Sequence, residues 1–168
     1  MNIKAAIFDM DGTLVDSLML WDVLWSTFGE IYLNDKSFVP SVEDDKKVRT
    51  LTLKDAMYLI HKNYKLGESG EELLALANTI MNDFYANKVE LKSGVREFLE
   101  YCKNKGIKMC IASATAPELI DVAMKHCDIG KYFLTSIEDK SSIVILALSA
   151  EFKIHLKKIL KCLRSEFK

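Results

Sequence analysis

The chain has 168 residues, enough for one domain or for a domain with a modest insertion. Its 23 basic and 24 acidic residues nearly cancel, so charge gives no reason to expect binding to nucleic acid or to an anionic membrane. The longest apolar run, residues 142–150, is far shorter than the roughly 20 residues of a membrane-spanning helix. We therefore expect neither a nucleic acid nor a membrane as partner.

The cysteines also restrict the class of protein. They are widely spaced and form no Cys-x-x-Cys pair, which is typical of buried or free thiols and not of a zinc site or a disulfide framework. The first residues lack a signal-peptide pattern, because Asp9 and Asp11 interrupt any apolar run. The sequence therefore predicts a cytoplasmic protein. The four cysteines are Cys102, Cys110, Cys127 and Cys162.

A short apolar segment, residues 3–8, opens the chain and is typical of a buried parallel strand. Two carboxylates follow it, Asp9 and Asp11, at the end of the strand where open α/β sheets bind ligands. Carboxylates this close repel each other unless a cation or a shared proton lies between them. Gly12 allows a sharp turn there, and Thr13 adds a hydroxyl group.

Residues 18–88 contain helical patterns and no strand candidate. Helices are expected over 18–28, from an N-cap at Ser41, over 53–64 and over 71–87. Trp21 and Trp25 lie one helical turn apart, which favours packing in a helical core, although one of them lining a substrate entrance is the alternative.

A strand–helix repeat resumes after this helical stretch. A helix is expected within 91–102, Gly106 ends it, and residues 107–112 form the next strand. Ser113 ends that strand and a helix opens at residues 116–118, with a proline in its first turn. This order is one step of a parallel α/β sheet. The Ser113 hydroxyl is either a phosphate ligand beside a helix N-terminus or an ordinary N-cap, and the residues alone favour neither.

The string Asp9-Met10-Asp11-Gly12-Thr13-Leu14-Val15-Asp16-Ser17, with the apolar strand before it, resembles the first motif of the haloacid dehalogenase-like hydrolases. The resemblance implies a Rossmann-like parallel sheet as the core domain, residues 1–16 and 89–168, and an inserted α-helical cap domain, residues 17–88. The capped phosphatase and sugar-phosphate mutase subgroup is the nearest. Asp16–Ser17 and Asn87–Lys88 are then candidate hinges of a lid that excludes water.

The same resemblance assigns roles to single residues. Asp9 is expected to attack a phosphoryl group and to form an aspartyl-phosphate, while Asp11 protonates the leaving oxygen and then activates water. Mg²⁺ is expected at the Asp9 carboxylate and the Asp11 main-chain carbonyl. Ser113 fits the family's second motif and would hold the phosphoryl group. Gly12, Thr13 and Ala114 are expected to complete the phosphate site.

The third and fourth family motifs are harder to find. Lys140 lies about where the family's lysine belongs, although Ser141 follows it where proline is common, and Lys131 is a weaker candidate. The alternative interpretation is that both lysines are ordinary solvated surface residues. No apolar strand ending in two acids follows; the spacing from Leu148 to Phe167 instead predicts a helix. The resemblance covers about residues 1–140, and we expect the remainder to be divergent or the product of a truncated or frame-shifted gene.

The resemblance implies a magnesium-dependent phosphatase that acts on a small phosphorylated metabolite, and other functions stay open. A sugar-phosphate mutase is the closest alternative, but the residues 18–28 lack the histidine that such members carry. A second alternative is a non-catalytic remnant or binding protein, because the last acidic motif is not found. A receiver domain phosphorylated on aspartate is disfavoured by the helical insertion.

Overall fold

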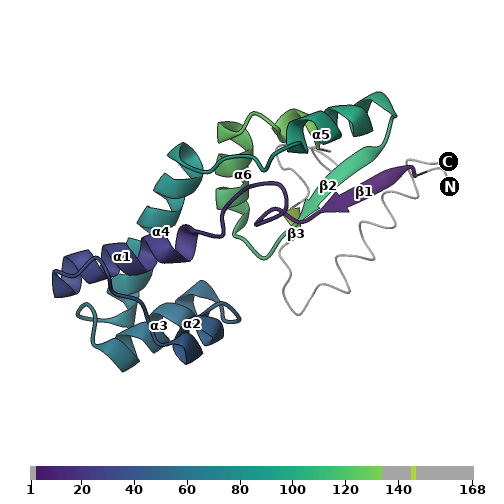
Figure 1. Cartoon of the computed structure of the whole chain (residues 1–168). Coiled ribbons are helices and arrows are strands. Elements are labelled where there is room, and N and C mark those ends of the chain that lie inside the picture. Colours follow the sequence, from purple (N-terminus) through teal and green to yellow (C-terminus); the bar gives the residue numbers. More distant parts are fainter. Residues whose placement is uncertain (1–2, 134–144, 147–168) are drawn as a thin grey trace. The chain divides into compact units, whose positions relative to one another are not determined.

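The computed structural model describes residues 3–133 and 145–146. The chain divides into two compact units (Figure 1). We call residues 1–17 and 85–168 the core unit, and residues 18–84 the helical unit. The domain boundaries predicted from the sequence lie at 16/17 and 88/89. No helix in the described part of the chain is long and apolar enough to cross a lipid bilayer.

The core unit is built on a parallel sheet, as the sequence predicts. Its strands are β1 (Ala5–Phe8), β2 (Lys108–Ala112) and β3 (Ile145–Leu146), which pair in that order across the sheet. Ala5 of β1 pairs with Lys108 of β2, and Phe8 pairs with Ile111. Because both strands run in one direction, the residues that follow Phe8 and Ala112 come out at the same edge of the sheet.

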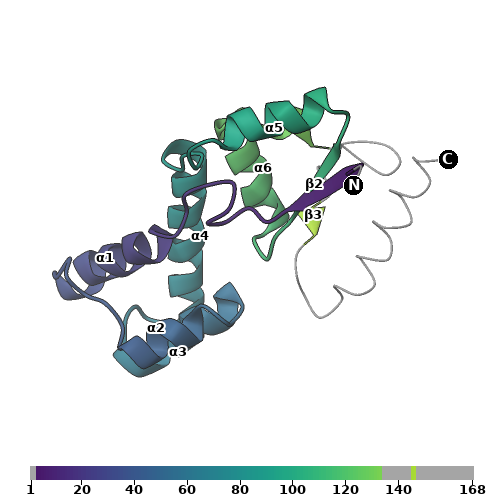
Figure 2. The same ribbon diagram turned by 45° about the vertical axis from the view of Figure 1, so that its right-hand side comes forward.

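The helices of the core unit begin and end where local chemistry dictates. Helix α5 (Val95–Asn104) runs alongside the β1–β2 pair (Figures 1 and 2), and α6 (Pro117–His126) begins with proline, whose fixed φ suits a first turn. Arg96 of α5 donates hydrogen bonds to the carbonyl oxygens of Cys127 and Asp128, at 2.7 and 3.2 Å, just beyond the end of α6. This satisfies carbonyl groups that a helix end leaves unpaired. A short 3-10 helix, η1 (Gly130–Tyr132), follows.

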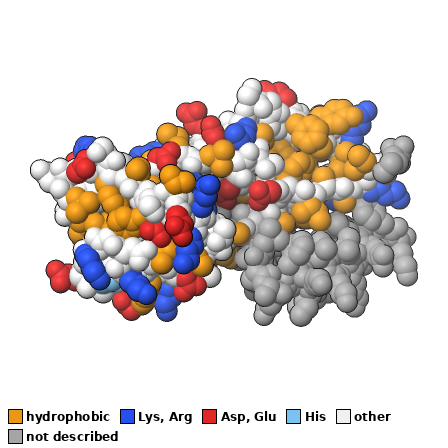
Figure 3. Space-filling model, turned by 60° about the horizontal axis from the view of Figure 1, so that its bottom comes forward, with side chains coloured by type: hydrophobic (Ala, Val, Ile, Leu, Met, Phe, Trp, Pro, Cys, Tyr) orange, Lys and Arg blue, Asp and Glu red, His pale blue; other side chains and the backbone are white. Residues whose placement is uncertain are grey.

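Apolar side chains from the sheet and from the helices fill the interior of the core unit. Met109 and Ile111 of β2 are buried with Leu99 of α5 and Ile120 of α6. The cysteines at 102, 110 and 127 are buried free thiols, as predicted, whereas Cys162 lies outside the described residues. On the right-hand side of Figure 3, which holds the sheet, other apolar side chains gather at the surface. Among the described residues of this unit, the exposed large apolar side chains are Ile3, Ile7, Phe98 and Tyr101.

The helical unit contains α1 (Leu20–Leu33), α2 (Val42–Val48), α3 (Leu53–Tyr64) and most of α4 (Gly70–Asn87), whose last residues belong to the core unit. The side chains of Ser41 and Thr52 accept hydrogen bonds from the third residue beyond them, so each caps its helix; the cap at Ser41 is confirmed. Helix α1 continues beyond the expected residue 28, because the left-handed turn that ends it comes only at Asn34.

Aromatic side chains dominate the core of the helical unit. Trp25 and Phe28 are buried, and the Trp25 indole donates a 2.9 Å hydrogen bond to the Asp45 carboxylate. Trp21 is half-buried, and its ring centroid lies 5.3 Å from that of Trp25. The central carbon of the Arg49 guanidinium lies over the Trp21 ring, 5.6 Å from its centroid. The prediction that the tryptophans pack in a helical core is therefore confirmed for Trp25.

Candidate active site at the carboxyl ends of β1 and β2

A tight turn follows β1 and fixes the position of both aspartates. The backbone N–H groups of residues 13, 14 and 15 all point at the Met10 carbonyl oxygen, with N···O distances of 3.3, 2.9 and 3.1 Å. Gly12, at the tip, has φ of +70°, a conformation that is unfavourable for a residue with a side chain. Its N–H donates back to the Val15 carbonyl oxygen at 2.9 Å.

The residue between the two aspartates anchors this turn. Met10 is completely buried, whereas Asp9 is exposed and Asp11 is half-buried. Because alternate residues of an extended chain point in opposite directions, burying Met10 turns both carboxylates away from the apolar core. Leu14 and Val15 are also buried and hold the far side of the turn. The spacing of the two acids thus has a direct structural cause.

The end of β2 contributes hydroxyl groups to the Asp11 carboxylate. The Ser113 hydroxyl lies 3.4 Å from Asp11 Oδ2, and the Thr115 hydroxyl donates a short hydrogen bond to the same oxygen. Ser113 Oγ in turn accepts a 3.1 Å hydrogen bond from the Thr115 backbone N–H. Ser113 is only 1% exposed, so its hydroxyl needs these partners. Residues 102 positions apart in the chain therefore meet here.

The other carboxylate oxygen of Asp11 has partners from different segments. Ser17 Oγ and the Tyr85 hydroxyl each donate to Asp11 Oδ1 at 2.6 Å. Tyr85 is 2% exposed. Its burial raises its pKa far above the ordinary tyrosine value, and the nearby Asp11 charge and hydrogen bond raise it further, so the hydroxyl keeps its proton and remains a donor.

The two segments of the core unit that flank this cluster pair with each other. Val15 and Leu91 form an antiparallel bridge, the Asp16 N–H donates to the Glu90 carbonyl oxygen at 2.8 Å, and the Lys92 N–H donates to the Leu14 carbonyl oxygen at 3.0 Å. The Lys92 and Asp16 side chains form a 3.4 Å ion pair that is largely exposed, so it adds at most about 1 kcal/mol. The backbone bonds do most to hold these segments together.

The structure brings some of the sequence-predicted site residues together and not others. Asp11 and Ser113 are in contact, and Asp9 and Gly12 belong to the same turn as Asp11. Thr13 and Ala114 are exposed beside them, one at the turn and one directly after Ser113. Lys140 lies outside the described residues. Lys131 pairs with Asp128 at 2.7 Å, as expected of a surface lysine.

Sequence reasoning missed the role of Tyr85. It treated Ser17 only as part of a candidate hinge and Thr115 only as a neighbour of Ser113, and it predicted no bond from either hydroxyl group to Asp11. Tyr85 appeared only as part of the helix expected over residues 71–87, and its partner Asp11 is 74 positions away. The one local signal is that a tyrosine hydroxyl needs a partner when the ring is buried. Ser17 and Thr115 stand inside or beside the motifs, where their hydroxyl groups could have been counted as possible donors.

The oxygen donors of this site suit a hard cation such as Mg²⁺, which typically binds through one or two carboxylates and retains several water molecules. The Asp9 carboxylate is exposed, and no described residue donates a hydrogen bond to it. Among residues 3–133 and 145–146, no three His, Cys, Asp or Glu side chains cluster as a metal site. The exposed Asp9 carboxylate, as a hard oxygen donor, fits such a cation.

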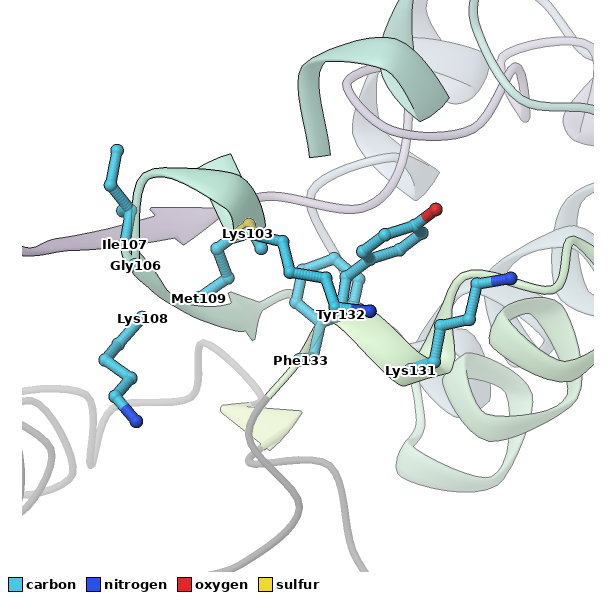
Figure 4. A pocket seen from close by; sticks show the side chains of 8 residues that line it. All are labelled: Lys103, Gly106, Ile107, Lys108, Met109, Lys131, Tyr132 and Phe133. Carbon is cyan, nitrogen blue, oxygen red and sulfur yellow. The ribbon is translucent and has the colours of Figure 1, made fainter. Parts of the chain in front are cut away.

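A cavity of about 260 Å³ lies elsewhere in the core unit (Figure 4). It is lined by Gly106, Ile107 and Lys108 at the start of β2, whereas Ser113 follows the end of the same strand. Lys103 also lines it, with its ammonium group over the Tyr132 ring at 5.5 Å. This cavity is therefore separate from the aspartate cluster and contributes no group to it.

Comparison with known proteins identifies the family. Residues 6–142, most of the chain, match the family described as haloacid dehalogenase-like hydrolase. The chain belongs to the haloacid dehalogenase-like hydrolases. The matched region contains the aspartate turn, Ser113 and all the described helices, so the predicted family is confirmed, and with it the α/β fold with a parallel sheet.

Several relatives within this family resemble the chain. It is 25% identical over 131 residues to a phosphorylated carbohydrates phosphatase from Thermotoga maritima, covering 77% of this chain and 58% of that protein. The chain thus spans little more than half the length of that relative. Among solved structures, a mutant of CbbY from Rhodobacter sphaeroides in complex with xylulose-(1,5)bisphosphate matches with a TM-score of 0.66 at 16% identity, covering 94% of this chain and 72% of that one.

A hydrolase of this family from Entamoeba histolytica, assigned to family IA, variant 3, matches with a TM-score of 0.67 at 16% identity, covering 94% of this chain and 70% of that one. At this level of identity the two structural matches establish the fold and nothing about the substrate.

Proposed function

We propose that this chain is a phosphatase that hydrolyses phosphoric monoesters of small carbohydrates. The observation that carries the proposal is the meeting of Asp11 with Ser113 at the carboxyl ends of β1 and β2, beside the exposed Asp9 carboxylate. Ligand sites of open α/β sheets lie at this edge. The name of the Thermotoga maritima relative supports phosphorylated carbohydrates as the substrate class.

In the proposed reaction the Asp9 carboxylate attacks phosphorus, the bond to the sugar oxygen breaks, and that oxygen takes a proton from Asp11. Asp11 then removes a proton from water, and the water oxygen attacks phosphorus and releases Asp9. The products are the dephosphorylated sugar, with a free hydroxyl group, and inorganic phosphate. Splitting one displacement into two in this way is nucleophilic catalysis. The Ser113 hydroxyl and the N–H groups at the start of α6 hold the phosphoryl oxygens.

The Asp9 carboxylate and the Asp11 main-chain carbonyl are the groups that would hold Mg²⁺. The ion would neutralise negative charge on the phosphoryl oxygens. We expect chelation of divalent metal to abolish hydrolysis and added Mg²⁺ to restore it. Hydrolysis that persists unchanged under chelation would contradict the metal dependence but not the role of Asp9.

The decisive experiment measures the release of p-nitrophenol from p-nitrophenyl phosphate by the wild type and by Asp9→Asn. The variant keeps the size of the side chain but removes the nucleophilic charge, so we expect no turnover above background. Asp121→Asn, an exposed aspartate on α6, is the matched control and should retain wild-type activity. Equal activity of wild type and Asp9→Asn would refute the proposal.

One observation favours a second candidate, a non-catalytic binding protein. No third acidic side chain joins Asp9 and Asp11 as a metal ligand among the described residues. Calorimetric titration with Mg²⁺ distinguishes the two: absence of binding at millimolar metal, together with absence of turnover, favours the binding protein. A sugar-phosphate mutase would instead return the phosphoryl group to a second hydroxyl, so it would yield an isomeric sugar phosphate and no inorganic phosphate.

A further inference from the structure

Tyr85 occupies a special position in the chain. It lies near the end of α4 and is the residue at which the chain re-enters the core unit, just as Ser17 is the residue at which the chain leaves it. Both residues donate to the same atom, Asp11 Oδ1, at 2.6 Å. The last residue of the first core-unit segment, Ser17, and the first residue of the second, Tyr85, therefore bond to one carboxylate oxygen.

The two oxygens of Asp11 differ in their surroundings. Oδ1 is held by the two 2.6 Å bonds from Ser17 and Tyr85. Oδ2 faces the end of β2, where it accepts from Thr115 and lies 3.4 Å from the Ser113 hydroxyl. A carboxylate has about four lone-pair sites, and these four donors use them all. The longest of the four contacts is the one to Ser113, so it is the easiest to exchange for another group.

Tyr85 is the more rigid of the two clamps on Oδ1. Its ring is almost completely buried, and its hydroxyl donates a 2.6 Å hydrogen bond to Asp11 Oδ1. A serine hydroxyl rotates freely about its own bond, whereas a tyrosine hydroxyl is fixed by the packing of a large ring. Tyr85 therefore restricts the orientation of the Asp11 carboxylate more strongly than Ser17 does.

We propose that Tyr85 is a positioning residue: by clamping Oδ1 it turns Oδ2 of Asp11 toward the phosphoryl site at Ser113, where Oδ2 delivers the proton to the leaving oxygen. This rests on the proposed phosphatase function. Tyr85 itself touches no substrate. The proton passes from Asp11 to the leaving oxygen, and Tyr85 keeps its own proton throughout.

The test compares Tyr85→Phe with the wild type on two substrates of nearly equal size, phenyl phosphate and p-nitrophenyl phosphate. Phenolate is a strong base that leaves well only when protonated, whereas p-nitrophenolate leaves with little help. The ratio kcat/KM reports the steps up to release of this group. We expect Tyr85→Phe to lower kcat/KM about 10- to 100-fold for phenyl phosphate and less than about threefold for p-nitrophenyl phosphate.

Two controls accompany this measurement. Tyr101→Phe removes the same hydroxyl group from an exposed tyrosine of the core unit and should change neither substrate's kcat/KM. Adding Tyr85→Phe to Asp11→Asn should produce no further selective loss on phenyl phosphate, because a positioning residue acts only through the group that it positions.

The possible outcomes separate the two proposals. If Asp9→Asn hydrolyses both substrates as the wild type does, the phosphatase proposal fails and the role of Tyr85 fails with it. If hydrolysis depends on Asp9 but Tyr85→Phe lowers kcat/KM equally for both substrates, the hydroxyl is merely structural. An unchanged Tyr85→Phe enzyme, or a selective loss that persists in the Asp11→Asn background, also overturns the inference while the phosphatase proposal stands.

Discussion

The two units of this chain bury different kinds of side chain. Among the described residues of the helical unit, the buried side chains are hydrophobic, with Trp25 and Phe28 among the largest. In the core unit two serine side chains are buried among the described residues, Ser17 and Ser113, and both bond to Asp11. Burying a hydroxyl group without a partner is unfavourable, so these serines are tolerated because Asp11 accepts from them.

Because of this difference, we expect substitutions in the two units to affect different properties, stability in one and the proposed reaction in the other. In the helical unit, removing a side chain should mainly remove packing. In the core unit, removing Asp11 should disturb both the proposed reaction and the buried hydroxyl groups that depend on it. The following experiments test that division, and they are ordered from the largest expected effect to the smallest.

Asp11→Ala should have the largest effect, on turnover. It removes the proposed general acid and base, so kcat/KM for phenyl phosphate should fall by about 10²- to 10⁴-fold. It also leaves the hydroxyls of Ser17 and Ser113 without their acceptor, which should lower the free energy of unfolding by about 1–3 kcal/mol. Steady-state kinetics and urea unfolding measure the two effects. A loss of stability without a loss of turnover would assign Asp11 a structural role.

Trp25→Ala should have the largest effect on stability in the helical unit. The side chain is 1% exposed, and replacing a buried tryptophan by alanine typically lowers the free energy of unfolding by about 3–5 kcal/mol. Trp25→Phe is the matched variant, because it keeps an aromatic ring but removes the donor to Asp45. Urea unfolding should rank the phenylalanine variant between wild type and alanine; equal stability of all three would contradict the packing role.

Gly29→Ala should have a smaller effect on the same unit. A methyl group there would collide with the Asp35 carbonyl oxygen and the Phe38 side chain, so overpacking should cost about 1–3 kcal/mol. Gly94→Ala in the core unit is the comparison: it meets open space and loses only about 1 kcal/mol from its φ of +80°. Thermal unfolding should show the larger shift for residue 29, and the reverse order would contradict the close approach.

The smallest expected effect is the pH dependence contributed by Asp45. The hydrogen bond from Arg49, followed by that from Trp25, holds the pKa of this carboxyl below its usual value of 3.8. A group whose pKa is lowered by folding adds stability above its unfolded pKa and loses it as pH falls through the folded value. The gap in urea midpoint between wild type and Asp45→Asn should therefore be constant near neutral pH and narrow as the pH falls below 3.8. A gap that is independent of pH would show that the charge plays no part.

Local patterns in the sequence predicted much of the fold correctly. The spacing of apolar residues gave the strands around 3–8 and 107–112, and the polar residue before the second helix, Ser41, was correctly taken as a cap. These features depend on residues within a few positions of one another, where propensity and capping act. The length of α1 was underestimated, because its end depends on the backbone at Asn34 and not on apolar spacing.

The candidate site was predictable where it lies on motifs and not where it depends on tertiary contacts. Asp9, Asp11 and Ser113 each follow an apolar strand, so their shared edge of the sheet could be inferred. The bond from Tyr85 to Asp11 could not, because no periodic pattern links a helix to a turn 74 positions away. The placement of Lys140 as the family lysine stays a prediction, since that residue lies outside the described part of the chain.

The buried thiols provide a built-in reporter. Burial raises the pKa of the Cys110 thiol to about 11 and raises that of Cys102 and Cys127 as well, so the reactive thiolate is scarce in the folded protein. Residues 18–84 contain no cysteine. The rate of alkylation at these three positions therefore reports how often the core unit opens transiently, and no cysteine has to be introduced for the measurement.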